Sequence, residues 1–230
     1  MKINLHLGLK QARLIQKEVA QQAVETRFFQ GLIELQYGQP VENKLRLLAR
    51  RIPWARGWPE DKKAFWNAEA FMWQQKIAKE QRQIIALELS ILEGKRNLDL
   101  GCGAYSYLPA AVGVDLADKM LQFNERVQRK VQHDLNLGLP FPAASFDSVT
   151  AIFLLNYIKD GQRLLQEIVR VLRPGGVFVV VLAAKPVQQR YQQQETNHFS
   201  SIQWKRKLSA FFQVKASERE KINFLWCYRR

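Results

Sequence analysis

Two glycines and an aspartate stand where an alternating strand-and-helix chain would hold a ligand. Gly101 and Gly103 follow a mostly apolar run at 97–100, and Asp115 ends a second apolar run shortly afterwards. In an open parallel sheet, ligands bind outside the carboxyl ends of the strands. Glycine lets the backbone turn sharply there and approach a ligand without a Cβ in the way. A carboxylate on the neighbouring strand tip can accept hydrogen bonds from a ribose diol, so this pattern predicts a nucleoside site.

The glycine turn lacks the third glycine of a dinucleotide fingerprint. That fingerprint reads G-x-G-x-x-G/A and seats a pyrophosphate on a helix N-terminus. Here Ser106 takes the third position, Tyr105 and Tyr107 flank it, and Pro109 follows. Such a crowded turn is poor for a doubly charged pyrophosphate but tolerates a ligand without phosphate, such as S-adenosylmethionine. Structural glycines in some other nucleotide fold are the alternative at this point.

Three further segments follow the glycine turn in order. They are His133-Asp134-Leu135, the stretch from Leu139 to Tyr157, and the stretch from Leu164 to Gly176 that runs into the apolar residues 177–182. With the turn, they resemble the class I S-adenosylmethionine-dependent methyltransferases in order and approximate spacing, over about residues 95–184. The chain departs from that family in the missing third glycine and in the short segment between Gly103 and Asp115, which has room for about two helical turns.

The order of apolar runs and helical patterns predicts an α/β fold. Strands that alternate with helices are typical of a doubly wound, mostly parallel sheet. The resemblance implies seven strands, of which the last is antiparallel, and the two β-rich runs at the end of the chain predict a terminal hairpin. We expect strands near 96–100, 111–115, 129–133, 148–154, 177–183, 211–216 and 222–228, and helices near 117–127 and 162–172.

The first part of the chain reads as helical. Apolar residues recur at roughly helical spacing over 8–36 and 40–52, and a further helix is expected from about Pro59 to Leu92. The segment between them contains two prolines, a glycine, Trp54 and Trp58, and it interrupts the pattern. We therefore expect two domains: a helical N-terminal cap at 1–93 and a methyltransferase-like Rossmann domain at 94–230.

The resemblance assigns cofactor-binding roles to residues that match the family's motifs. Asp115 is expected on the ribose, Asp99 near the glycine loop or the amino group of the methionine end, and Asp134 on the adenine. The alternatives are a turn cap for Asp99, a helix N-cap for Asp115 and an Asx turn for Asp134. The full set of predicted cofactor contacts is Asp99, Gly101, Cys102, Gly103, Tyr105, Asp115, Leu116, Met120, Asp134, Leu135, Ala151, Ile152 and Phe153.

Catalytic residues are harder to predict, because methyl transfer from a sulfonium needs mainly alignment of donor and acceptor. A general base is required only when the acceptor is protonated and weakly nucleophilic. Asn156 and Tyr157 follow the fourth expected strand, where many members of the family carry polar groups on the substrate side. They are the candidates, although no proline follows Asn156 as in amino-directed DNA methylases. The expected product is S-adenosylhomocysteine, and no metal is expected, since the three histidines show no ligand spacing.

The net charge of +14 bears on the acceptor. Residues 97–185 are nearly neutral, with 9 basic and 8 acidic residues, whereas 1–96 hold 17 basic against 10 acidic and 186–230 hold 9 against 3. Basic flanks attract acidic partners, including nucleic acid, although a merely solvated basic surface is the alternative. We expect a small-molecule acceptor first, an RNA acceptor second, and a cofactor-binding protein without catalysis third. The oligomeric state is unknown.

Cysteine usage and hydropathy predict the compartment. Cys102 and Cys227 show no motif spacing, which favours a reducing environment. No apolar run approaches the ~20 residues that cross a bilayer, and the N-terminus lacks the apolar centre of a signal peptide. The sequence therefore predicts a cytoplasmic protein without stable membrane insertion.

Overall fold

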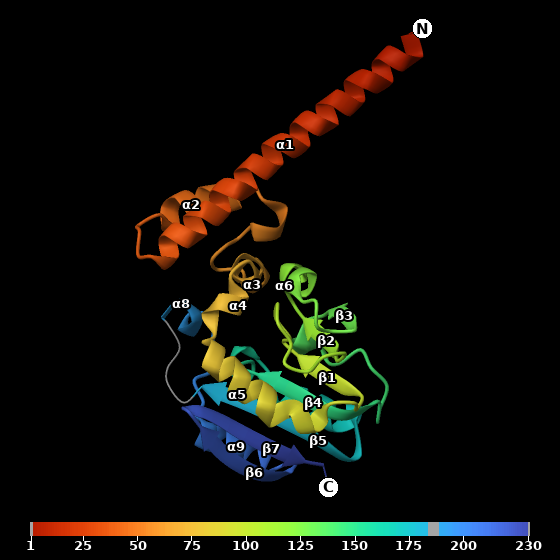
Figure 1. Cartoon of the computed structure of the whole chain (residues 1–230), viewed down its shortest axis with the longest axis vertical. Coiled ribbons are helices and arrows are strands. Elements are labelled where there is room, and N and C mark those ends of the chain that lie inside the picture. The colour runs from red at the N-terminus through yellow and green to blue at the C-terminus, as the bar shows by residue number, and fades with distance from the viewer. Residues whose placement is uncertain (1, 184–188, 230) are drawn as a thin grey trace. The chain divides into compact units, whose positions relative to one another are not determined.

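The computed structural model describes residues 2–183 and 189–229, and the chain divides into two compact units (Figure 1). The first unit ends at Phe71 and the second begins at Met72. Among the described helices, none combines the length and the apolar character that crossing a membrane requires.

The first unit is helical, and its helices pack through small and capping residues. α1 and α2 approach closely at Gly31, where a Cβ would lie 2.7 Å from Cδ2 of Leu45. Asp61 caps α3, because its side chain accepts a hydrogen bond from the amide of Ala64 at 2.8 Å. The elements of this unit are α1 (Lys2–Gln36), α2 (Glu42–Ala49), the short 3-10 helix η1 (Pro53–Ala55) and α3 (Lys62–Ala70).

Aromatic rings fill the interior of the first unit. Phe28 is fully buried and meets Trp54 and Trp58 edge-on, with ring centroids 5.8 Å apart in both pairs. Trp58 itself is buried. The tryptophan-rich segment that interrupts the helical pattern therefore supplies core contacts within this unit.

The second unit is an α/β layer structure. Its short helices before the sheet are α4 (Trp73–Lys76), α5 (Lys79–Leu89) and η2 (Ser90–Leu92). The sheet and its connections comprise β1 (Asn97–Leu100), β2 (Val112–Asp115), α6 (Asp118–Phe123), β3 (Arg129–Gln132), η3 (Leu135–Leu137), β4 (Phe146–Ile152), η4 (Leu155–Tyr157), α7 (Gly161–Val171), β5 (Leu172–Ala183), α8 (Gln189–Gln192), α9 (Ser201–Leu208), β6 (Gln213–Arg219) and β7 (Ile222–Tyr228).

The seven strands found among the described residues form one sheet in the order β3-β2-β1-β4-β5-β7-β6. β1 pairs in parallel with β2 and β4, β2 with β3, and β4 with β5. β7 runs antiparallel to β5 and forms a terminal hairpin with β6. The predicted fold class is confirmed, including the antiparallel last strand and the hairpin. The strand order reverses at β1 and β4, which is where ligands bind in such sheets.

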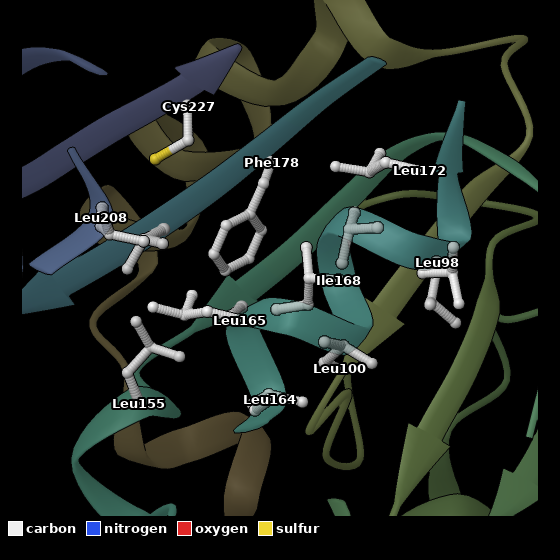
Figure 2. Close-up of a cluster of buried hydrophobic side chains, with 14 of the residues drawn as sticks. Leu98, Leu100, Leu155, Leu164, Leu165, Ile168, Leu172, Phe178, Leu208 and Cys227 are labelled. Carbon is white, nitrogen blue, oxygen red and sulfur yellow. The ribbon is translucent and has the colours of Figure 1, made fainter. Parts of the chain in front are cut away.

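Helices cover both faces of the sheet because successive strand residues point to opposite sides. On one face, Ile85 and Leu89 of α5 pack with Val179 of β5. On the other face, Ile168 of α7 and Leu208 of α9 pack around Phe178 (Figure 2). Leu98 and Leu100 belong to this second face, so the intervening Asp99 belongs to the first.

Several connections differ from the sequence-based expectation. The helix expected from Pro59 to Leu92 is divided into α3, α4 and α5, with Ile77 and Ala78 in extended conformations between the last two. The helix expected at 117–127 already ends at Phe123. No helix forms at 101–111 between β1 and β2, and α9 was not foreseen. The two units divide after Phe71 and not after residue 93, since α5 packs on the sheet, but the domain assignment itself stays a prediction.

Candidate functional site

The tips of β1 and β2 are joined by the hydrogen bonds of the glycine turn. The amide of Gly103 donates to Oδ2 of Asp115 at 2.9 Å, and the amide of Cys102 donates to the carbonyl of Val114 at 3.1 Å. Gly101 and Gly103 have φ values of +60° and +56°. Only glycine adopts these angles without steric cost, so the sharp turn explains both glycines.

Asp115 holds the turn with one oxygen and its own strand end with the other. Oδ1 accepts from the amide of Ala117 at 2.9 Å. The N-cap position of α6 is Ala117 and not Asp115, so the N-cap alternative does not describe this carboxylate. Burial raises the pKa of Asp115 to about 6, against the backbone hydrogen bonds that oppose the rise.

Asp99 is buried between two hydroxyl groups. Ser106 Oγ donates to its Oδ2 at 2.6 Å, and Thr150 Oγ1 of β4 donates to its Oδ1 at 2.8 Å. Burial raises the pKa of Asp99 to about 6, the two hydroxyl hydrogen bonds oppose the rise, and the charge of Asp115 adds to it. Both carboxylates therefore lie at the same end of the sheet, and their negative charges repel each other.

Two residues that support the turn were not predicted as site residues. Ser106, which replaces the third glycine, ties the turn back to Asp99. The fully buried Asn124 donates to the carbonyls of Cys102 at 3.3 Å and Gly103 at 2.9 Å. The substitution of a small hydroxyl residue for the glycine was a visible signal for Ser106. The sequence carried no such signal for Asn124, because a single asparagine after a helix usually indicates only that the helix ends there.

A small cavity lies beside the turn. It has a volume of about 20 Å³ and room for about one water molecule. Trp73 lies over the turn, since a Cβ on Gly103 would be 2.8 Å from its Nε1. The cavity brings together six of the predicted contacts, Asp99, Gly101, Cys102, Tyr105, Ile152 and Phe153, with Trp73, Ile77 and Tyr107.

The end of β4 also lines this cavity, through Ile152 and Phe153. Phe153 has a φ of +54°, which is uncommon for a residue with a side chain, and its amide donates to the carbonyl of Val181 at 2.8 Å. Backbone strain of this kind gathers at functional sites. Ala151 is fully buried in the core, and its cofactor role stays a prediction.

The other predicted cofactor contacts are not among the residues lining the described cavity. Asp134 accepts from the amide of Asn136 at 2.9 Å in a turn, as the Asx-turn alternative expects. Leu135 and Met120 are buried, and the carbonyl of Leu116 accepts from Gln132 Nε2 at 3.2 Å. Their cofactor roles stay predictions.

Asn156 and Tyr157 lie in the turn η4 after β4. Oδ1 of Asn156 accepts from Nε1 of the buried Trp204 at 2.7 Å, and its carbonyl accepts from the amide of Thr196 at 2.9 Å. Asn156 thus ties the segment after β4 to the segment after β5. These contacts support a positioning role, and a catalytic role for Asn156 or Tyr157 stays a prediction.

The residues at the strand tips fit an adenosyl cofactor. Gly101 and Gly103 leave space beside the turn that Leu154 and Trp73 fill in this structure, and the hydroxyl of Tyr107 is buried without a hydrogen-bond partner among the described residues. Strand order and pairing define a doubly wound α/β fold of the Rossmann-like class, and the turn with its two buried carboxylates is its candidate ligand site.

The comparisons with known proteins agree with that class. Residues 98–180 match the family described as methyltransferase domain. This match and the curated relatives below confirm the resemblance to the class I S-adenosylmethionine-dependent methyltransferases that was inferred from the motifs.

Curated relatives match part of the chain. The demethylmenaquinone methyltransferase of Staphylococcus saprophyticus is 30% identical over 128 residues, which cover 49% of this chain and 54% of that protein. The demethylmenaquinone methyltransferase of Geobacillus kaustophilus is 32% identical over 122 residues, which cover 46% and 52%. The chain thus spans about half the length of the curated relatives it matches.

Solved structures share the fold. A chain from the complex of the Haloferax volcanii Trm112 methyltransferase activator with a methyltransferase has a TM-score of 0.56 at 16% identity, covering 71% of this chain and 97% of that chain. A SAM-dependent methyltransferase from Aquifex aeolicus has a TM-score of 0.54 at 17% identity, covering 65% and 89%. At such identities the likeness concerns the architecture of the sheet and its helices.

Proposed function

We propose that this protein transfers a methyl group from S-adenosylmethionine to a small-molecule acceptor. The observation that carries the proposal is the link between Gly103 and Asp115, which joins two adjacent strand tips at the carboxyl edge of the sheet. A glycine turn beside a carboxylate is the arrangement that suits an adenosyl group without phosphates.

Each residue of the turn has a distinct part in holding the cofactor. The carboxylate of Asp115 accepts hydrogen bonds from the amides of Gly103 and Ala117, and its remaining lone pairs would accept hydrogen bonds from the ribose hydroxyls. The glycine backbone allows close approach of the methionine end, and Asp99 offers a negative charge to its ammonium group. Ile152 and Phe153 supply apolar surface beside it.

When bound, the cofactor supplies an activated methyl group on a sulfonium. The protein's own part is to align the acceptor with that group and to exclude water. Alignment of this kind accounts for up to ~7–11 kcal/mol of a barrier. The strained backbone at Phe153 and the loop tied by Asn156 are the elements on the acceptor side that fix this alignment.

Binding requires a local rearrangement at Trp73. Small-molecule sites have volumes of about 300–1,000 Å³, whereas the cavity beside the turn has about 20 Å³. The indole of Trp73 lies over Gly103, where the cofactor would contact the backbone. We therefore expect the Trp73 side chain to leave this position when the cofactor binds.

A small-molecule acceptor has the support of the relatives' names, since demethylmenaquinone is a small molecule. RNA is the second candidate acceptor, and the net charge of +14 favours it. The exposed Lys205, Arg206 and Lys207 of α9 are part of this charge. Binding to RNA that weakens steeply with added salt would support the second candidate.

The test is a labelled-methyl transfer assay on separated metabolite and RNA fractions of a cell extract. The proposal expects label from S-adenosylmethionine in the metabolite fraction. Label in RNA alone would show that the acceptor is RNA and not a small molecule. If calorimetry shows that the protein binds S-adenosylmethionine but no fraction receives label, the protein binds the cofactor without catalysing transfer. That result would overturn the enzymatic proposal.

A further inference from the structure

A second cavity lies between α7 and α9, which pack on the face of the sheet that α5 does not cover. Its volume of about 610 Å³ falls within the range of about 300–1,000 Å³ that is usual for small-molecule sites. It shares no lining residue with the cavity beside the glycine turn. We name it the α7–α9 cavity, and its wall includes Lys159, Leu165, Asn197, Phe199, Lys207 and Phe211.

Aromatic and aliphatic side chains make much of the wall of the α7–α9 cavity. The buried Trp204 lines it and is fixed in place, because its Nε1 donates to Oδ1 of Asn156. The ring of Phe199 meets the Trp204 ring edge-on, with centroids 5.4 Å apart. The buried Leu165 of α7 and the half-buried Phe211 add further apolar surface. A wall of this kind suits the ring of an aromatic ligand.

The charge around the α7–α9 cavity is positive. Lys159 and Lys207 line it, and Nζ of Lys207 lies 4.4 Å from the centroid of the Phe199 ring. α9 carries three basic residues and no acidic one. Among the described residues that line the cavity, only Asp160 is acidic, and its Oδ1 accepts from the amide of Arg163 at the N-terminus of α7, where the helix dipole offsets its charge. The cavity therefore favours an anionic ligand.

Asn197 adds a hydrogen-bond acceptor to the wall of this cavity. Its Nδ2 donates to the carbonyls of Leu155 at 3.5 Å and Ile158 at 3.3 Å, which fixes the orientation of the amide. Its Oδ1 is buried and has no hydrogen-bond partner within residues 2–183 and 189–229. Buried polar atoms in native proteins nearly always have a partner in protein, water or ligand. A ligand hydroxyl in the cavity that Asn197 lines would supply the missing donor.

We propose that the α7–α9 cavity binds a small aromatic carboxylic acid that carries a hydroxyl group. The ring packs against Phe199 and Phe211, the carboxylate lies near Lys159 and Lys207, and the hydroxyl donates to Oδ1 of Asn197. This site goes beyond the proposed function, because it is a second ligand site whose residues take no part in holding the cofactor.

The experiment is a calorimetric titration of the wild-type protein with 4′-hydroxybiphenyl-4-carboxylate at pH 7. Biphenyl-4-carboxylate, which lacks the hydroxyl, and 4-hydroxybiphenyl, which lacks the carboxylate, are the matched probes. We expect the hydroxy acid to bind at least about threefold more tightly than either of them, because one hydrogen bond and one partly solvated ion pair each contribute a modest gain. If the hydroxy acid does not bind, or binds no more tightly than either matched probe, the proposal is wrong.

Variants of α9 and the segment after it locate the bound probe. Ala210 is exposed and lines the cavity, so Ala210→Trp fills it and should raise the Kd of the hydroxy acid at least about tenfold. Its exposed neighbour Ser209 is not among the lining residues, and Ser209→Trp should change the Kd by less than about twofold. Equal affinities in these two variants would place the probe elsewhere and overturn the proposal.

Lys207→Met keeps the test decisive if Ala210→Trp does not fold, because Lys207 is exposed. It should raise the Kd of the hydroxy acid about threefold and leave that of 4-hydroxybiphenyl unchanged. Lys205→Met, on the same helix but outside the lining, is its control. An equal effect of Lys207→Met on both probes contradicts the assignment of the carboxylate.

A competition titration separates this site from the cofactor site. Saturating S-adenosylmethionine should change the Kd of the hydroxy acid by less than about twofold, because the two cavities share no lining residue. Displacement of the hydroxy acid by S-adenosylmethionine would overturn the proposal of a second site. If the protein does not bind S-adenosylmethionine at all, the proposed function fails, whereas selective binding of the hydroxy acid still supports this site.

Discussion

The amide of Gly103 and the carboxylate of Asp115 are bonded across adjacent strands at 2.9 Å. This bond connects the turn after β1 with the tip of β2. The carboxylate is buried, which makes its remaining acceptor capacity valuable to a ligand that arrives with hydroxyl groups.

Replacing Gly101 with alanine should destabilise the protein more than an equivalent change elsewhere. Its φ of +60° disfavours a side chain, and the new Cβ would lie 2.6 Å from Cδ1 of Leu154. Strain and overpacking together predict a fall of about 2–4 kcal/mol in the free energy of unfolding, measured in denaturant.

Gly175→Ala is the matched control for that change. Its φ is +73°, but no atom lies within 4 Å of the new Cβ, so only the backbone cost of about 1–2 kcal/mol applies. A Leu154→Ala background should recover part of the loss at Gly101. Equal costs at Gly101 and Gly175 would show that packing against Leu154 is irrelevant.

The pH dependence of stability should carry the signature of the two buried carboxylates. Burial raises the pKa of Asp99 and of Asp115 to about 6, whereas an unfolded aspartate titrates near 3.9. The folded protein thus binds more protons than the unfolded chain between about pH 4 and 6. The contribution of these groups to the free energy of unfolding is present below pH 4 and is lost as the pH rises to 6 and above.

Asp99→Asn removes one of the two titrations and keeps an acceptor for the hydroxyls. Two pKa units correspond to roughly 3 kcal/mol, so the variant's loss of stability between pH 4 and 7 should be smaller by up to about that amount. Denaturant unfolding at several pH values measures the difference. Parallel pH curves for the variant and the wild type would show that Asp99 is not responsible.

Trp73→Ala should raise the affinity for S-adenosylmethionine several-fold. The indole lies over Gly103 in the ligand-free protein, and the variant no longer has to displace it. Calorimetric titration measures the change, with Trp226→Phe on β7 as the control variant. A Kd that rises tenfold would mean that the indole instead belongs to the bound site.

Asn156→Ala should lower the free energy of unfolding by about 1–3 kcal/mol, because it leaves the indole N–H of the buried Trp204 without its acceptor. Asn156→Asp keeps an acceptor and should cost less. Unfolding curves of the two variants decide the point. If both are as stable as the wild type, the bond between Asn156 and Trp204 does not hold the loop.

The first two strands were predictable because they are short runs of alternating apolar residues that end at Gly101 and at Asp115. All residues of β5 from Val177 to Leu182 are buried, because both faces of this strand are covered, and they form a continuous apolar run in the sequence. The cluster of Asp99, Gly101 and Phe153 was expected because the family resemblance assigned each of them a cofactor contact, and the three line one cavity.

Long-range side-chain partners were not predictable in the same way. Asn124 reaches the turn over 21 residues of chain, and Trp73 covers Gly103 from a helix before the sheet. Such contacts depend on tertiary packing and leave no periodic pattern. The break between α4 and α5 was missed for a related reason, since Ile77 and Ala78 are not residues that usually end helices.

The central claim is tested most directly by titrating S-adenosylmethionine into the wild type, Asp115→Ala and the exposed control Glu218→Ala in a calorimeter. We predict saturable binding to the wild type and the control, and binding weaker by about 1–3 kcal/mol in Asp115→Ala. An equal affinity in all three proteins, or no binding to the wild type, would contradict the account.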